Sequence, residues 1–131
     1  MLQSPPMKTS SRYVDGFLLV VSKKNLPAYR RMAAEGCRIW KKYGALDYKE
    51  CVGDDLKPKG VTLTFPKIVK QKPSEVIIFS YITYKSRAHR DQVNAKVMKD
   101  SSMNDPKYKN KPMPFDMKRM SFGGFTVIVS D

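Results

Sequence analysis

The segment that most restricts the fold is RYVDGFLLVVSKK, residues 12–24, because its strand pattern is apolar on both faces. Successive side chains of a strand point to opposite sides of the sheet. A sheet built on this strand therefore needs a covering layer on each side. The two sets of side chains are Tyr13, Asp15, Phe17, Leu19 and Val21 on one side, and Val14, Gly16, Leu18 and Val20 on the other.

The rest of the chain alternates between helical and strand patterns of hydrophobicity. Their order is β-α-β-β-α-β, the ferredoxin-like plan of the α+β class, with one antiparallel four-stranded sheet and two helices on one of its faces. We expect a flexible N-terminal tail at 1–12 and a single domain at 13–130. After the first strand, the predicted elements are a helix at 25–44, a strand at 45–55, a connection at 56–74, a strand at 75–85, a helix at 86–100, a loop at 101–116 and a strand at 118–130.

Residues with strong positional preferences support these boundaries. Asn25 and Ser86 are suited to capping the N-termini of the two helices, and Gly44 is suited to ending the first one. In the last strand, Gly123 and Gly124 indicate either a bulge or a close backbone approach. The inward face predicted for the first helix contains Leu26, Tyr29, Met32, Ala33, Cys37, Trp40 and Tyr43.

Two helices can cover only one face of the predicted sheet, whereas its strands carry apolar residues on both. The uncovered face would be a large exposed apolar patch on a monomer. A second copy of the chain, related by a two-fold axis, would cover it. We therefore predict a homodimer that associates through the sheet face; the alternative is a face that stays open for a ligand.

The only histidine, His89, shares a helical stripe with Val93 and Val97. It is either a structural residue or a general acid or base in a cleft between helix and sheet. The leading hypothesis is a pocket there that binds or converts a small apolar or aromatic molecule, with His89 as its catalytic group; whether the chain is an enzyme stays open. The predicted walls of this pocket are Phe17, Trp40, Phe79 and Tyr81, and the candidate neighbours of His89 are Asp15, Glu50, Tyr81 and Tyr84.

A formal net charge of +13 indicates nucleic acid as an alternative partner, because a basic surface attracts phosphate groups. RNA-recognition motifs share the predicted strand order, but their aromatic segments lie on the first and third strands. Here the most similar string, SFGGFTVIV, lies on the fourth strand. The charges are also dispersed along the sequence, so nucleic acid ranks below a small molecule. A third reading is a structural or stress-related dimer without a ligand.

The sequence gives no support for a metal-binding, membrane-associated or secreted protein. The two cysteines, Cys37 and Cys51, do not have metal-binding spacing, and we predict neither a metal nor a cofactor. No apolar run reaches the length of a membrane span, so we expect no membrane association. Residues 1–12 lack the apolar core of a signal peptide, which predicts a cytoplasmic protein.

Several uncommon strings occur together and in a fixed order, among them YVDGFLLVV, VIIFSYITYKSRAHRDQVNAKVM and MPFDMKRMSFGGF. They resemble the YbaA-like family of uncharacterised bacterial proteins over most of residues 13–129. That family is similar in fold to the dimeric α/β-barrel superfamily, which includes cofactor-independent monooxygenases, chlorite-dismutase-like haem proteins and stress-response domains. The resemblance implies a dimeric barrel. It implies no activity, because a fold does not specify a function.

Overall fold

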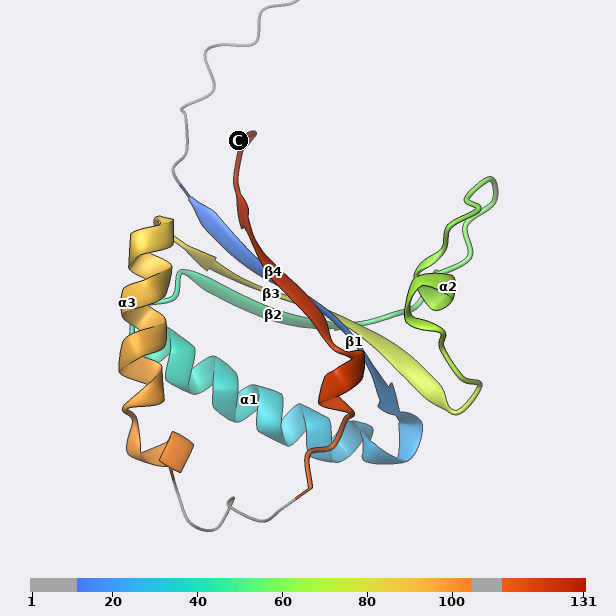
Figure 1. Cartoon of the computed structure of the whole chain (residues 1–131), viewed down its shortest axis with the longest axis horizontal. Helices are drawn as coiled ribbons and strands as arrows, with labels where there is room; N and C mark the ends of the chain where they lie inside the picture. The colour runs from blue at the N-terminus through green and yellow to red at the C-terminus, as the bar shows by residue number, and fades with distance from the viewer. Residues whose placement is uncertain (1–11, 105–111) are drawn as a thin grey trace, which may run out of the picture.

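The computed structural model describes residues 12–104 and 112–131 (Figure 1). Its centre is an antiparallel four-stranded sheet in the order β2-β3-β1-β4. This order confirms the predicted α+β, ferredoxin-like arrangement. The strands are β1 (Tyr13–Ser22), β2 (Asp47–Val52), β3 (Glu75–Tyr84) and β4 (Ser121–Thr126).

Two helices, α1 (Leu26–Lys42) and α3 (Arg87–Met98), lie together on one side of the sheet (Figure 1). We call this side the helix face and the opposite side the outer face. Two clusters of buried side chains fill the space between sheet and helices, one around Tyr84, Val93 and Val97 and one around Leu19 and Ile78. The shorter helical segments are η1 (Lys23–Asn25), α2 (Phe65–Val69), η2 (Ser101–Asn104) and η4 (Met117–Arg119).

The predicted helix boundaries are largely confirmed. Ser86 caps α3 by accepting a hydrogen bond from the backbone N–H of His89. Gly44 follows α1 with a φ of 113°, a conformation that favours glycine. Asn25 precedes α1, but its side chain accepts no capping bond, because the turn of η1 already leads into the helix. Ile39 is 2% exposed and belongs to the buried face of α1, although it is not among the residues predicted for that face.

The last strand is shorter than predicted. Residues 117–119 form a 3-10 turn, and β4 ends at Thr126 because its partner β1 begins at Tyr13. One further bond joins the N–H of Val127 to the carbonyl of Arg12 at 3.0 Å. The register along Gly123 and Gly124 is continuous, so β4 has no bulge there. The predicted tail lies outside the described residues, apart from Arg12.

The outer face is covered only at one end. The connection predicted at 56–74, which we call the excursion, contains α2 and lies near the end of β1 (Figure 1). There, Val20 and Ile77 are both 2% exposed although they point outward. Further along the same face, Phe79 and Phe125 are 48% and 61% exposed. The double cover predicted for the first strand is therefore incomplete in a single chain.

Candidate functional site

The sheet separates the predicted site residues into two groups. Phe17, Trp40 and His89 lie on the helix face. Phe79 and Tyr81 lie on the outer face, where their ring centroids are 6.2 Å apart. Because the sheet stands between the groups, the five residues do not line one pocket.

His89 makes contacts that organise the start of α3. Its Nδ1 accepts a hydrogen bond from the backbone N–H of Lys85 at 2.9 Å, and its own N–H donates to Ser86 Oγ at 3.0 Å. Burial, with the nearby charges of Lys85 and Lys96, lowers the pKa of His89 below its usual value. The ring is therefore neutral at pH 7 with its proton on Nε2. Of its four candidate neighbours, Tyr84 contacts it edge-on. A catalytic role for His89 stays a prediction.

Trp40 and Phe17 belong to the packing between helices and sheet. Trp40 Nε1 donates a hydrogen bond to Asn94 Oδ1 at 3.0 Å, which joins α1 to α3. Phe17 stacks on Phe122 of the neighbouring strand at a centroid distance of 5.6 Å. The predicted role of both residues as pocket walls stays a prediction.

An ion pair is buried beside β1 on the helix face. Asp15 is 3% exposed and lies 3.0 Å from Nη1 of Arg90, whose guanidinium stands 4.9 Å from the centre of the Tyr13 ring. Burial raises the pKa of Asp15, and Arg90 opposes this shift. The second partner of Arg90 is Asp91, at 2.8 Å from Nε. These contacts fix α3 against β1.

Two tyrosines hold the carboxylate of Glu50 under α1. Tyr29 donates to Oε1 at 2.7 Å and Tyr48 donates to Oε2 at 3.0 Å. Burial and the adjacent carboxylate raise the pKa of both phenols, so both remain protonated donors. Within the described part of the chain, two phenol hydroxyl groups satisfy this carboxylate. These hydrogen bonds hold β2 to α1.

The outer face has a gap in its side chains near its centre. Gly16 of β1 pairs with Gly123 of β4, and both positions point outward. A Cβ on Gly123 would meet no atom within 4 Å, whereas one on Gly16 would lie 3.5 Å from the Phe125 ring. Tyr81 pairs with Gly16 on the other side. We call this gap the notch; Gly16 and Gly123 lie at its base, and Tyr81 and Phe125 lie at its sides.

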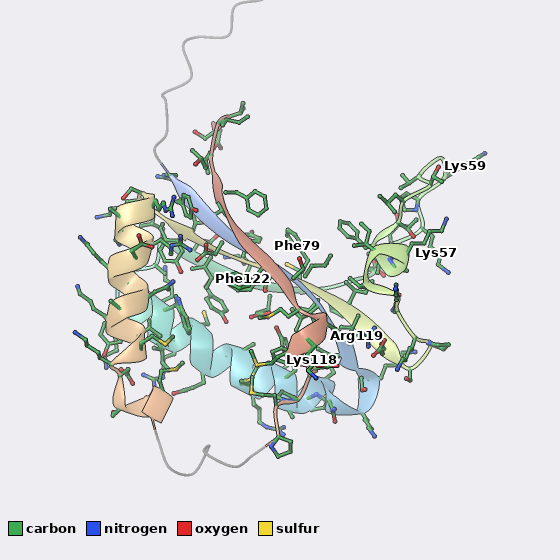
Figure 2. All side chains as sticks on the ribbon, in the orientation of Figure 1. Lys57, Lys59, Phe79, Lys118, Arg119 and Phe122 are labelled. Carbon is green, nitrogen blue, oxygen red and sulfur yellow. The ribbon has the colours of Figure 1, made fainter. Side chains whose placement is uncertain are left out.

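The row of residues beside the notch is also apolar. Leu18 pairs with Phe79 on β3 and with Ser121 on β4, and Cys51 follows Phe79 on β2. Phe79 and Phe122 lie on opposite sides of the sheet (Figure 2). The notch and this row form the candidate functional site. Two of its residues, Phe79 and Tyr81, were predicted from the sequence as pocket walls.

The outer face carries little charge for so basic a chain. The charged side chains that its paired strands direct outward are Asp47 and Lys49 on β2, which form an ion pair with each other, and Glu75 at the start of β3, which is paired with Arg119. In the described strands, Lys49 is thus the single lysine that points outward from the middle of the sheet. The net charge of +13 is therefore distributed over other surfaces.

Comparison with known proteins identifies the family. The model of the family described as "Protein of unknown function (DUF1428)" matches residues 12–117. The chain belongs to the DUF1428 family. It is 41% identical over 120 residues to the uncharacterized protein YbaA of Escherichia coli K12, covering 92% of this chain and 99% of YbaA. The YbaA protein of Shigella flexneri gives the same values.

The de novo designed protein Foldit4 aligns with a TM-score of 0.43 and 10% identity, over 88% of this chain and 98% of the designed one. Within the described residues, no helix has the length and apolar character needed to cross a membrane.

Proposed function

We propose that this DUF1428 protein is a homodimer whose two outer faces meet, and that it binds a small apolar or aromatic molecule in the notch between them. The observation that carries the proposal is the exposed apolar site around paired Gly16 and Gly123. Phe79 at 48% and Phe125 at 61% exposure flank that gap. Large aromatic side chains at such exposure are typical of surfaces that bind a partner.

Electrostatics supports association through this face in particular. Two copies of a chain with a net charge of +13 repel each other over most of their surfaces. The outer face is the exception, because Asp47 and Lys49 are paired there and the neighbouring residues are neutral. Contact through the part of this face that the excursion leaves uncovered therefore buries apolar area without bringing uncompensated strand charges together, while the lysines of the excursion lie beyond its covered end.

The sheet supplies more than half of the area that a dimer needs. Strands spaced about 4.8 Å apart, with about 3.3 Å per residue, give this sheet a face of about 500 Å². A stable interface buries about 800 Å² per partner. The chain beyond β4 supplies additional apolar area, because Ile128 and Val129 are 89% and 69% exposed.

The notch explains why a small molecule fits this interface. The two paired glycines bear no side chains; the ring of Phe125 lies over Gly16, and the space above Gly123 is open. The borders of the notch are the rings of Tyr81 and Phe125, which suit stacking or edge contacts with an aromatic ligand. When a second outer face closes over it, the notch becomes an apolar site with one phenol per protomer.

Two phenylalanines of β4 provide a matched test of the dimer. Phe125→Asp changes the outer face, whereas Phe122→Asp changes the helix face at an exposure of 63%, close to the 61% of Phe125. We expect Phe125→Asp to produce a monomer and Phe122→Asp to leave the dimer intact, as measured by light scattering over a concentration series. A monomeric wild type, or equal behaviour of the two variants, would refute the dimer.

The ligand site has a separate test. Gly123→Leu places a side chain in the notch, where the structure leaves space. We expect this variant to remain dimeric and to lose binding of anilinonaphthalene sulfonate, measured by fluorescence. Retention of the probe by Gly123→Leu at wild-type affinity would exclude the notch. The alkylation rate of Cys51, an exposed thiol beside Phe79, reports independently whether the face is covered.

A further inference from the structure

The excursion is strongly cationic. Residues 56–74 contain five lysines and no acidic residue, while Asp54 and Asp55 immediately precede the segment. All five lysine side chains are exposed. Lys59 lies at the tip that projects furthest from the sheet, and Lys57 lies below it, at the level of α2 (Figure 2). The lysines are Lys57, Lys59, Lys67, Lys70 and Lys72.

In the excursion, apolar side chains are exposed and a polar side chain is buried, which is the reverse of a folded core. Its buried residue is Thr64, at 8% exposure. The residues on either side of it, Leu63 and Phe65, are 71% and 46% exposed. Val61 and Ile68 add exposed fractions of 49% and 51%. The segment thus presents its apolar side chains to solvent, among the lysines.

This conformation is held in place by the body of the protein. Arg119 forms a bidentate ion pair with Glu75, with distances of 2.5 and 3.0 Å. The same guanidinium donates to the carbonyls of Val69 and Lys70 at 3.1 and 3.0 Å. The base of the excursion is therefore fixed before any partner binds, which lowers the entropic cost of docking.

The tip is ordered as well. The N–H of Val61 donates to the carbonyl of Pro58 at 3.2 Å, and Gly60 takes a φ of 88° in this turn. Below the tip, the excursion borders an open hollow of about 460 Å³, whose lining includes Lys57, Thr64 and Lys67. An ordered projecting turn thus combines exposed apolar side chains with a hollow lined by two cations.

Although the lack of an apolar run long enough to span a membrane led us to expect no membrane association, we propose that the excursion docks on an anionic phospholipid surface without crossing it. Leu63, Phe65 and Ile68 insert at the level of the headgroups, and Lys57, Lys59 and Lys67 contact the lipid phosphates. Apolar insertion and attraction to anionic lipids together determine the strength of such interfacial binding. The proposal is independent of the dimer and of the notch.

The combination of charge and apolar exposure selects this partner over others. A second copy of this chain carries a net charge of +13, so as a whole it repels a cluster of five lysines. A nucleic acid would satisfy the lysines, but it would leave Leu63 and Ile68 without a role, because stacking on bases requires aromatic rings. An anionic bilayer satisfies both sets of residues.

The test is co-sedimentation of the full chain with vesicles. We expect binding to vesicles of phosphatidylcholine mixed with phosphatidylserine, little binding to phosphatidylcholine alone, and weakening by salt. The triple variant Lys57→Gln, Lys59→Gln and Lys67→Gln should bind about a hundredfold more weakly, because each lysine near an anionic surface contributes a factor of about five. Leu63→Ser should weaken binding about tenfold through lost apolar insertion.

A matched variant controls for net charge. Lys41→Gln, Lys96→Gln and Lys99→Gln remove the same number of exposed charges from α1 and from the end of α3. This variant should keep its affinity within about threefold. Equal loss in the two triple variants, or no binding to anionic vesicles, would overturn the proposal. So would tight binding of a single-stranded oligonucleotide through Lys57, Lys59 and Lys67 without vesicle binding.

Discussion

Replacing Gly124 by alanine tests how tightly β4 is packed against β1. Gly124 pairs with Asp15 and points to the helix face. A Cβ at this position would overlap Tyr13 Oη and lie 2.6 Å from two carbons of the same ring. Tyr13 is 9% exposed, and the Arg90 guanidinium covers its ring at 4.9 Å. The ring cannot move aside without disturbing the bond from Arg90 to Asp15.

The expected cost has two parts. Overpacking of a well-packed site costs about 1–3 kcal/mol. Loss of the contact between Arg90 and the Tyr13 ring adds about 1 kcal/mol, since the pair is shielded from water. We therefore expect Gly124→Ala to lower the free energy of unfolding by about 2–4 kcal/mol.

Urea denaturation monitored by circular dichroism measures this free energy. The neighbouring Gly123→Ala is the control, because its Cβ enters open space and should change stability by less than about 1 kcal/mol. Combining Gly124→Ala with Tyr13→Leu should restore part of the loss, because the smaller side chain removes the clash. If both alanine variants are equally stable, the close approach of Tyr13 does not constrain this position.

Two further predictions concern buried polar groups. Tyr43, Ser102 and Lys42 donate hydrogen bonds to Asp100 and hold the pKa of its carboxyl well below the usual value near 4. The stabilisation that the carboxylate provides is therefore complete above about pH 4 and is lost as the pH falls through the lowered pKa. The urea midpoint of the wild type should drop on acidification, and parallel pH curves for wild type and Asp100→Asn would contradict this. Asn94→Ala leaves Trp40 Nε1 without its acceptor and should cost about 1–3 kcal/mol in thermal unfolding, whereas an unchanged melting temperature would show that this hydrogen bond is dispensable.

The sequence shows which strand residues lie on the same face of the sheet, but it does not show on which side of the sheet that face lies. A period of two shows that Phe79 and Tyr81 share a face, but it does not show which face the helices cover. For that reason, the predicted pocket joined these residues to Trp40 and His89, which lie on the other side of the sheet. The assignment depends on how α1 and α3 pack, and no local pattern specifies that packing.

The sequence also does not show which basic residues lie close together in the folded chain. Along the sequence the lysines are dispersed, and this pattern argued against a charged site. In the structure, the N–H of Lys23 bonds to the carbonyl of Ser74, and Arg119 reaches Lys70. These contacts bring η1, the excursion and η4 to one end of the molecule. The local density of charge is thus a property of the tertiary fold.

The sequence by itself determined the order of the elements, the position of Gly44 after the first helix and the cap at Ser86. Those signals act between residues that are close along the chain. It also indicated that one layer of helices leaves apolar strand residues uncovered. Only the tertiary structure distinguished Gly123, which floors an open notch, from Gly124, which Tyr13 covers. Both are glycines in one strand, and their roles differ because contacts from distant segments differ on the two faces of the sheet.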